Sequence, residues 1–531
     1  MCGIAAVHSH DADTVIDTQC AGASAGRSAG GFAGAFAGVD EMLDRLAHRG
    51  PDDRGTRMVG GHTWLGHRRL SIVDLDGGHQ PLGGTHGDAD WSIVCNGEIY
   101  NHQELRDEMP ASAFGSSSDS AAALAVLRTD GPRGLHRLRG MWALCAATPG
   151  GGFVAARDAV GIKPLYWART DTAVHFASEL RAFTPEAQAR AEIFPPGHWW
   201  SPEDGLHRFA DPVPSHAAEA DWSAVPEQVI EKATFESVSD SVRRHLMADV
   251  EVGVFLSGGL DSGIVAAVAA EAYARQGRRL KTFSVGTADS PDLLAARETA
   301  AFLGTEHHEA VLESEASRRV LDEVVACVES FDASLIRSAV PNWFLSELAS
   351  RHVKVVLTGE GADELFAGYG YYHEQHAAPE ALDAELRRTV GALHGLNLQR
   401  CDRVTMAHGL EARVPFLDHG VMAHAMSLPA HMKGLEDDGM EKGHLRRAFT
   451  GRLPDHLLWR RKEQFGTGSG AESLLSPLWD GRITDEEFAA AASGAGAPEL
   501  RSKEELGYYR TFRSALPGIR PEAVLTRFAT V

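Results

Sequence analysis

The stretch VGVFLSGGLDSGIVAAVAA, residues 252–270, decides the fold of the second half of the chain. Its apolar, β-branched start predicts a strand that ends at Leu256, and the small residues after the glycine pair predict a helix. Gly258 and Gly259 let backbone N–H groups approach an anion, and the helix start adds the positive end of its dipole. The stretch therefore predicts a phosphate-binding loop. It has no Gly-Lys-Ser/Thr sequence, so it is not a Walker loop, and simple γ-phosphoryl transfer is disfavoured.

Further strands alternate with helices after this loop. LKTFSVG (280–286) precedes the helical stretch 292–304, and HVKVVLTG (352–359) precedes another turn and helix. Apolar strands that alternate with helices indicate a parallel sheet covered on both faces. The second half of the chain is therefore predicted to be an α/β domain.

Acidic residues crowd the loop TGEGADELFAGY, where Glu360, Asp363 and Glu364 follow a predicted strand. Parallel sheets place ligand sites at the carboxyl ends of their strands. Acids beside nucleotide phosphates need a cation, and Mg²⁺ bridging Asp261 and Asp363 would supply it. Further along, three cations are candidates for neutralising phosphates: Lys442, Arg446 and Lys462.

The first part of the chain has a different pattern, with short apolar runs bounded by Gly, Asp and Asn that predict layered antiparallel sheets. An Ala/Gly-rich insertion at residues 21–38 is interpreted as a flexible surface segment. A Pro-rich, acidic stretch at 209–226 is interpreted as a linker. The expected domains are residues 1–208 and 226–531.

Composition limits the classes of partner. The chain of 531 residues has a net charge of −22, and such a surface repels nucleic acids and anionic membranes. No apolar run is long enough to span a bilayer, and no signal peptide is evident. Its six cysteines are scattered and form no CxxC pair, which is typical of a reducing cytoplasm and disfavours a zinc site or a disulfide framework.

The cysteine at position 2 raises the question of an N-terminal nucleophile. Removal of Met1 would give Cys2 both a free α-amino group and a thiol. The amine titrates at about pH 7.7–8.0 and the thiol at about 8.5, so one can act as base for the other. An ordinary small residue on a first strand remains the alternative from these residues alone.

Several long motifs, in fixed order, resemble the glutamine-hydrolysing asparagine synthetases. The first half carries MCGIAAV, LAHRGPDDRG, HRRLSIVDLDGGHQPL, CNGEIYNHQELR and RDAVGIKPLYW, which characterise class II glutamine amidotransferase domains. The second half carries SGGLDS, which resembles the loop of the ATP pyrophosphatases, and then LTGEGADELFAGY, HGLEARVPFLD, MEK and RRKEQF. The resemblance covers nearly the whole chain, apart from the insertion and a short C-terminal tail.

This resemblance implies an αββα sandwich with an N-terminal nucleophile, followed by a parallel-sheet α/β ATP pyrophosphatase domain. It implies that Cys2 releases ammonia from glutamine and that the second domain uses ATP and Mg²⁺ to adenylate a carboxylate. Ammonia then crosses between the sites and displaces AMP. The expected partners are small molecules only, with no nucleic acid and no membrane, and the family often forms homodimers. The expected location is the cytoplasm.

The resemblance also assigns roles in the glutaminase half. Cys2 is the nucleophile, Asn96 and the N–H of Gly97 form the oxyanion hole, and Arg49 lies near the ammonia exit. The residues expected to bind glutamine are Arg69, Ile72, Val73, Glu98 and Asp119.

In the synthetase half, Glu360 is expected to take a proton from the attacking ammonium and Lys442 to stabilise the adenylate as it collapses. Asp261 and Asp363 are the expected metal ligands, and Arg337 is the expected clamp for the acceptor's carboxylate. The residues expected to bind ATP are Leu256, Ser257, Gly258, Gly259, Asp261, Ser262, Val285, Gly286, Thr358, Gly359 and Lys462.

Some positions depart from the family pattern. Ala121 stands where a glutamate is usual, and GEGAD with Ala362 replaces the commoner GEGSD. Near Arg337, the usual threonine pair appears as Ser334 and Leu335. These last changes lie where the family reads its acceptor, so they question aspartate more than they question amidation.

The leading hypothesis is therefore glutamine-dependent synthesis of asparagine from aspartate. One alternative keeps the mechanism but takes another carboxylate from specialised metabolism. A second alternative is a non-catalytic sensor of glutamine or nucleotide, and a β-lactam synthetase is disfavoured because it would not need Cys2. The pair His307 and His308 is not expected to bind a metal, because adjacent residues on a strand point to opposite faces.

Overall fold

The computed structural model describes residues 2–10, 36, 38–84, 90–213, 222–375, 378–436, 438–461, 465–479, 481–494 and 498–528. The Ala/Gly-rich insertion lies almost wholly outside these residues. The chain divides into two compact units. The first comprises residues 1–210 and 515–525, and the second comprises residues 211–514 and 526–531.

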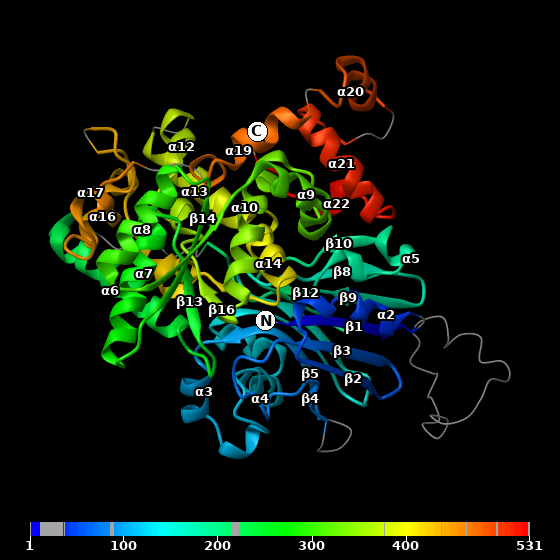
Figure 1. Ribbon diagram of the computed structural model, residues 1–531. Coiled ribbons are helices and arrows are strands. Elements are labelled where there is room, and N and C mark those ends of the chain that lie inside the picture. Colours follow the sequence, from blue (N-terminus) through cyan, green and yellow to red (C-terminus); the bar gives the residue numbers. More distant parts are fainter. Residues whose placement is uncertain are drawn as a thin grey trace. The chain divides into compact units, whose positions relative to one another are not determined.

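The N-terminal unit contains two six-stranded antiparallel sheets, with orders β10-β8-β9-β1-β3-β2 and β12-β11-β7-β6-β5-β4 (Figure 1). The strands of the first sheet are β1 (Gly3–Ser9), β2 (Asp53–Val59), β3 (Thr63–Arg69), β8 (Tyr166–Arg169), β9 (Ala173–Ala177) and β10 (Ala191–Ile193). The strands of the second are β4 (Leu82–Gly83), β5 (Ser92–Ile99), β6 (Gly140–Ala147), β7 (Phe153–Arg157), β11 (His198–Ser201) and β12 (Gly205–Arg208).

The two sheets pack face to face through a shared apolar core, which includes Ile4 and Phe176 from the first sheet and Val94 and Cys145 from the second. On the far side of the second sheet, Cys95 packs among residues of helix α4 (Ser120–Asp130). Helix α3 (His102–Glu108) lies beside α4, and α2 (Val39–Asp44) packs on β1 and β3. The order of layers confirms the predicted αββα sandwich.

The turn RDAVGIKP after β7 is held by two charged side chains. The carboxylate of Asp158 accepts hydrogen bonds from the backbone N–H groups of Trp142, Val160, Gly161, Ile162 and Lys163. Arg157 donates to the carbonyl oxygens of Gly161, Lys163 and Phe194. This motif therefore serves the scaffold, because its charges satisfy buried backbone groups.

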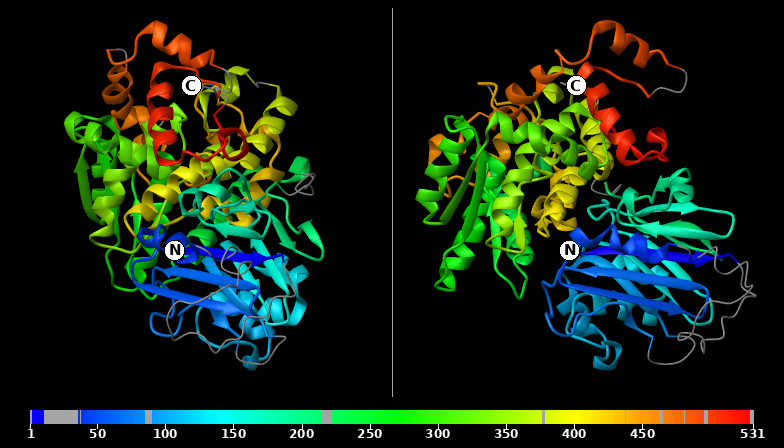
Figure 2. Two further views of the ribbon diagram at one scale, coloured as in Figure 1. Left: turned by 90° about the vertical axis from the view of Figure 1, so that its right-hand side faces the viewer. Right: turned by 45° about the vertical axis from the view of Figure 1, so that its right-hand side comes forward.

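The C-terminal unit is built on a parallel sheet of order β15-β14-β13-β16-β17. Green arrows in Figure 2 are strands of this sheet. Its strands are β13 (Val252–Phe255), β14 (Lys281–Gly286), β15 (Glu306–Val311), β16 (Val355–Leu357) and β17 (Glu411–Arg413). The order reverses between β13 and β16, which is the point where open α/β sheets bind ligands. The predicted parallel-sheet α/β domain is thus confirmed.

Helices cover this sheet on both faces (Figure 1). Helices α10 (Ala333–Ser350) and α14 (Asn397–Ala407) contribute Leu345 and Cys401 to a core that contains Phe283 and Val356 of the sheet. Helices α7 (Leu260–Arg275) and α8 (Pro291–Leu303) contact β13 and β14 from the other face. Helix α6 (Glu227–His245) follows the expected linker and packs on α7. Among the described residues, no helix combines the length and the apolar character that a bilayer span requires.

The C-terminal tail contributes to both units. Residues 515–525, which include α22 (Pro521–Val524), belong to the N-terminal unit, where Ile519 and Val524 are buried. The backbone N–H of Gly518 donates to the side chain of Gln188 at 3.3 Å. Nothing in the sequence pattern indicated that residues 515–525 belong to the N-terminal unit.

Candidate active sites

The first candidate site lies at the start of β1. The backbone nitrogen of Cys2 donates to Oδ1 of Asn96 at 3.0 Å, and the Cys2 side chain is buried. The carbonyl oxygen of Cys2 accepts from Nε of Arg49 at 3.0 Å. Both backbone groups of Cys2 are therefore bound, so the backbone that carries the thiol is held in place.

Asn96 and Gly97, on β5, have the geometry expected of oxyanion donors. The Nδ2 group of Asn96 is buried without a hydrogen-bond partner. A buried donor without a partner is costly, which is typical of a group kept for a ligand. Gly97 has φ 142°, and a Cβ atom there would lie 1.9 Å from the carbonyl oxygen of Met141. This position therefore requires glycine.

Arg69 is buried near the same site, but its guanidinium already makes contacts. It donates to the carbonyl oxygens of Val73, Asp74 and Leu75 at 3.2, 2.6 and 3.0 Å. These bonds shape the loop that contains Ile72 and Val73. Arginine has five N–H donors, so at least two remain for a carboxylate.

The two acids expected to bind the ammonium of glutamine are buried on neighbouring elements. Asp119 accepts from the backbone nitrogen of Ile99 at 2.7 Å, which joins the end of β5 to the start of α4. Glu98 is buried on β5 itself. Burial and the charge of Asp119 both raise the pKa of the Cys95 thiol, which stays neutral. Cys2 and not Cys95 is thus the candidate nucleophile.

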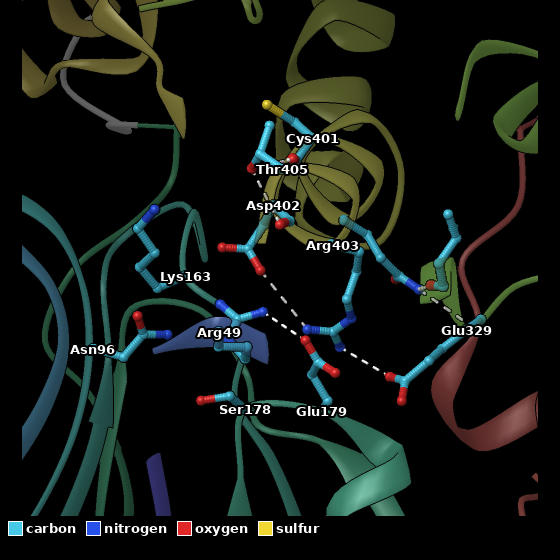
Figure 3. A network of polar contacts seen from close by, with 12 residues as sticks. Arg49, Asn96, Lys163, Ser178, Glu179, Glu329, Cys401, Asp402, Arg403 and Thr405 are labelled. Atoms are coloured by element: carbon cyan, nitrogen blue, oxygen red, sulfur yellow. Dashed lines mark hydrogen bonds and ion pairs between the residues drawn. The ribbon is translucent and has the colours of Figure 1, made fainter. Parts of the chain in front are cut away.

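Arg49 belongs to a charged network with His48 and Glu179. Its Nη1 binds Glu179 at 2.7 Å, and both side chains are buried (Figure 3). His48 also binds Glu179, at 3.0 Å. Glu179 therefore orients the arginine that binds Cys2, and its role was not found because it lies about 130 residues away in the sequence. In the C-terminal unit, Arg403 pairs in a similar way with Glu329 at 3.0 Å (Figure 3).

The second candidate site is a cavity of about 350 Å³ at the carboxyl edge of the parallel sheet. The SGGLDS loop forms one wall. The hydroxyl of Ser262 accepts from the backbone nitrogen of Ser257 at 3.1 Å and lies 3.0 Å from its hydroxyl. Gly258 has φ 76°, and a Cβ atom there would lie 2.3 Å from the carbonyl oxygen of Asp292.

The other expected ATP-binding residues come together around this loop. Those that line the cavity are Leu256, Ser257, Gly259, Asp261, Ser262, Val285, Thr358 and Gly359. Gly286 ends β14 beside them. Lys462 lies outside the described residues.

Two acids and one lysine converge in this cavity. Nζ of Lys442 lies 2.6 Å from Asp261 and 2.5 Å from Asp363, and its side chain is only 1% exposed. The backbone of Lys442 is in the left-handed region at φ 57°, a strained conformation common at functional sites. The carboxylates of Asp261 and Asp363 therefore converge on one cation position, and such an oxygen donor set fits Mg²⁺.

Glu360 also lines the cavity, paired with Arg400 of α14. The sequence pattern does not single out Arg400, because a cation in a helix usually indicates a solvated face. Arg460, the first residue of the motif RRKEQF, was not singled out either: it donates to the carbonyl oxygen of Gly258 at 3.1 Å and binds Asp292 at 2.7 Å. Arg446 of α16 (Gly443–Ala448) lines the cavity as well, and it donates to Glu441 and to the carbonyl oxygens of Leu458 and Arg460.

Arg337, the expected clamp for the acceptor, faces the same cavity from α10. It is held by two glutamates, Glu504 at 2.5 Å and Glu472 at 3.4 Å. Burial acts to lower the pKa of Arg337, but the bond and charge of Glu504 outweigh it, so the pKa is raised. The arginine is thus charged and already paired.

The histidine pair lies on β15. His307 contacts the hydroxyls of Thr282 and Ser284, whereas His308 contacts Glu306 and stacks on His352. The two rings therefore have separate partners.

Comparison with known proteins agrees with the division of the chain into an N-terminal and a C-terminal unit. The family model described as Asparagine synthase matches residues 234–387 and 374–493, and the one described as Glutamine amidotransferase domain matches residues 1–197. The curated glutamine-hydrolyzing asparagine synthetase 3 of Arabidopsis thaliana is 38% identical over 490 residues, which cover 89% of this chain and 83% of that protein.

Two further relatives match over most of both lengths. The glutamine-hydrolyzing asparagine synthetase of Sandersonia aurantiaca is 38% identical over 512 residues, 90% of this chain and 93% of its own. The probable glutamine-hydrolyzing asparagine synthetase of Dictyostelium discoideum is 35% identical over 516 residues, 90% of each chain. The chain therefore belongs to the family of glutamine-hydrolysing asparagine synthetases and is an enzyme with an amidotransferase domain and a synthetase domain.

Proposed function

We propose that this enzyme releases ammonia from glutamine at Cys2 and uses it to amidate a carboxylate that ATP has activated, with aspartate as the acceptor and asparagine as the product. The observation that carries the proposal is the presence of two separate constellations in one chain. Cys2 lies against Asn96 in the first unit, and Lys442 lies with Asp261 and Asp363 beside a phosphate-binding loop in the second.

In the first half-reaction, the Cys2 thiolate attacks the side-chain amide carbon of glutamine. The α-amino group of Cys2, left free by removal of Met1, takes the thiol proton and returns a proton to the leaving ammonia. Negative charge develops on the amide oxygen, where Nδ2 of Asn96 and the N–H of Gly97 stabilise it. Water then releases glutamate from the thioester. Arg69, Glu98 and Asp119 are suited by charge to the α-carboxylate and α-ammonium of glutamine.

In the second half-reaction, the SGGLDS loop binds the phosphates while the acceptor carboxylate attacks the α-phosphorus of ATP and displaces pyrophosphate. Ammonia then attacks the acyl carbon and displaces AMP. Ammonium carries no lone pair, so a base must take its proton, and Glu360, a carboxylate that lines the cavity, is the proposed base. Lys442 supplies positive charge to the AMP oxygen as it leaves.

Asp261 and Asp363 would hold Mg²⁺, because their carboxylates converge on one cation position. The ion, when bound, supplies positive charge that offsets the phosphates of ATP. We further propose that the enzyme acts in the cytoplasm, as its scattered cysteines suggest, and that it forms a homodimer, as the family resemblance implies.

A different carboxylate acceptor is the second candidate. It is favoured by Ser334 and Leu335, which replace the usual threonine pair, since Ser334 lines the cavity beside Arg337. The mechanism is the same in both cases and only the product differs.

AMP release over a panel of carboxylic acids, with glutamine and ATP present, distinguishes the candidates. Aspartate is expected to give the highest kcat/KM and asparagine as product. A higher kcat/KM for AMP release with another acid would show that this acid, and not aspartate, is the acceptor. Failure of every acid to release AMP would contradict the proposed amidation.

A further inference from the structure

The last residues that the structure describes form part of the wall of the synthetase cavity. Residues 515–525 belong to the N-terminal unit, and the chain rejoins the C-terminal unit at Thr526. Arg527 and Phe528 line the cavity that contains the SGGLDS loop. We call residues 526–528 the strap. A three-residue segment thus brings an aromatic and a basic residue to the cavity from the end of the chain.

The first residue of the strap packs where a glycine leaves room for it. Gly395 ends the 3₁₀ helix η6 (Leu393–Gly395), and a Cβ atom there would lie 2.3 Å from Oγ1 of Thr526. Leu393 and Leu396, in the same turn, also line the cavity. A larger side chain at position 395 would therefore push the strap away from this part of the cavity wall.

A buried acid holds the middle of the strap. The side chain of Arg527 binds Glu505 of α21 (Lys503–Ala515), whose carboxylate is buried. Arg501 binds the same carboxylate at 2.8 Å and donates to the carbonyl oxygen of Phe528 at 2.7 Å. Two arginines therefore share one buried acid, and removal of either leaves this acid less well compensated.

The end of the strap is bound to the start of α10. The backbone nitrogen of Phe528 donates to Oδ2 of Asp332 at 3.2 Å, and Arg501 donates to the same oxygen at 2.8 Å. Oδ1 of Asp332 accepts from the backbone nitrogen of Leu335 at 3.0 Å and so caps α10. One buried carboxylate therefore fixes both the strap and the helix that contributes Arg337 to the cavity.

The strap is attached by polar contacts rather than by deep burial. Thr526, Arg527 and Phe528 are each partly buried, whereas Ile519 and Val524, earlier in the tail, are buried. A segment with little buried apolar surface can be displaced without unfolding the core. The strap therefore has the attachment expected of a cover over the cavity rather than that of a core element.

The proposed reaction needs such a cover. Water and ammonia can each attack the acyl carbon of the adenylated acceptor, and in both reactions the bond from this carbon to the AMP oxygen breaks. Ammonia gives the amide, whereas water restores the carboxylate, passes its protons to the solvent and consumes ATP without product. Closed sites that exclude water suppress such side reactions.

We propose that the strap closes the cavity during synthesis and excludes water from the acyl-adenylate, with Phe528 as the residue that covers the cavity and Arg527 as the positioning residue that holds the strap. This inference rests on the proposed function, because it requires an acyl-adenylate in the cavity. It adds that the end of the chain controls how this intermediate is divided between amide and carboxylate, whichever acid is the acceptor.

The test measures AMP and amide in the same reaction of the full-length enzyme. Ammonium chloride is the nitrogen source, so that the glutaminase site is not required, and the acceptor is the acid with the highest kcat/KM in the panel. The wild type should form AMP and amide in equal amounts. Phe528→Ala should raise the ratio of AMP to amide at least about twofold, because water then reaches the intermediate. The KM for ATP stays unchanged.

The matched control for this variant is Phe302→Ala. Phe302 is an exposed phenylalanine near the end of α8, and its side chain does not line the cavity. Its loss should leave the ratio of AMP to amide as in the wild type. A rise in this control equal to that in Phe528→Ala would overturn the strap, because the effect would not depend on the cavity.

Arg527→Gln tests the positioning role. It removes the charge that binds Glu505, so the ratio of AMP to amide should rise as in Phe528→Ala, again at unchanged KM for ATP. A purely structural role would lower AMP and amide together through loss of folded enzyme and leave their ratio unchanged. Arg520→Gln, at an exposed position just before α22, is the matched control and should keep the wild-type ratio.

The outcomes separate the strap from the proposed function. If the wild type forms amide but Phe528→Ala and Arg527→Gln keep its ratio of AMP to amide, the strap is wrong and the proposed function stands. A wild type that releases much more AMP than amide also overturns the strap, because its cavity is then open to water. If the wild type releases no AMP with any acid, both proposals fall.

Discussion

Asn96 binds the backbone nitrogen of Cys2 through Oδ1 at 3.0 Å, while its Nδ2 is buried without a partner. One side chain therefore orients the nucleophile and keeps a donor for the developing oxyanion. Replacement of Asn96 by Ala is expected to lower the kcat of glutamine hydrolysis by about 10²–10³, the usual cost of one oxyanion donor. Glutamate release measures the loss. Synthesis with ammonium should persist, and an equal loss of both activities would contradict this assignment.

Replacement of Cys2 by Ala should abolish glutamine-dependent synthesis, because it removes the thiol that we propose attacks the amide. Ammonium should still support synthesis, since the second half-reaction does not use Cys2. Cys145→Ala is the control: this thiol is buried between the two sheets, and its loss should leave both activities in place. Full glutaminase activity in Cys2→Ala would exclude Cys2 as the nucleophile.

Glu360→Ala should have the converse effect. Glutamine hydrolysis continues, and amide formation stops because no base takes the proton of the attacking ammonium. Asparagine and glutamate are measured in the same reaction. The substitution also leaves Arg400 without its partner, so thermal unfolding must show that the variant folds. Persistent synthesis in a folded variant would remove Glu360 from the mechanism.

A methyl group at Gly97 is expected to destabilise the protein by about 2 kcal/mol or more, because its Cβ would overlap the carbonyl oxygen of Met141 at 1.9 Å. Gly115→Ala is the matched control, since no atom lies within 4 Å of a Cβ there. Urea unfolding of both variants measures the difference. Equal stability of the two variants would show that β5 and β6 separate easily at this point.

Buried histidines predict a loss of stability in mild acid. Burial is the main cause that lowers the pKa of His8, His175, His245, His408 and His444 to about 4 and that of His67 to about 3. The unfolded chain takes up protons near pH 6.5, whereas the folded chain does not, so stability is complete above pH 6.5 and falls as the pH drops toward 4. Each histidine contributes up to about 2 kcal/mol of the loss at pH 5.

Urea unfolding at pH 7.5, 6 and 5 checks this dependence. His175→Gln should make it shallower, because one buried neutral ring no longer titrates on unfolding. His136→Gln, at an exposed position, should leave it as in the wild type. A stability that does not change between pH 7.5 and 5 would contradict the prediction.

The parts of the molecule that could be predicted from sequence are those fixed by local backbone requirements. The loop at 252–270 is an example, because a strand, a glycine with φ 76° and a helix start follow one another in a short stretch. The sheet types also followed from local patterns: short apolar runs in the first half and alternating strands and helices in the second.

Partners distant in the chain could not be predicted. Arg400, Glu179 and Glu504 look like ordinary surface charges in their own segments, yet they bind Glu360, Arg49 and Arg337. Arg337 was expected to bind the acceptor, and it lines the cavity, but its two glutamates lie 135 and 167 residues away in the sequence. Only the folded chain shows that Arg337 pairs with both Glu472 and Glu504.

The course of the C-terminal tail limits how the enzyme can be taken apart. Residues 515–525 complete the N-terminal unit, whereas Arg527 and Phe528 return to bind Glu505 and Asp332 of the other unit. A single cut at the linker near residue 211 therefore removes residues 515–525 from the N-terminal unit and leaves them on the C-terminal piece. The amidotransferase domain therefore cannot be transferred to another synthetase as an N-terminal segment alone. Its transfer requires two segments, residues 1–210 and 515–525, which are encoded far apart in the gene.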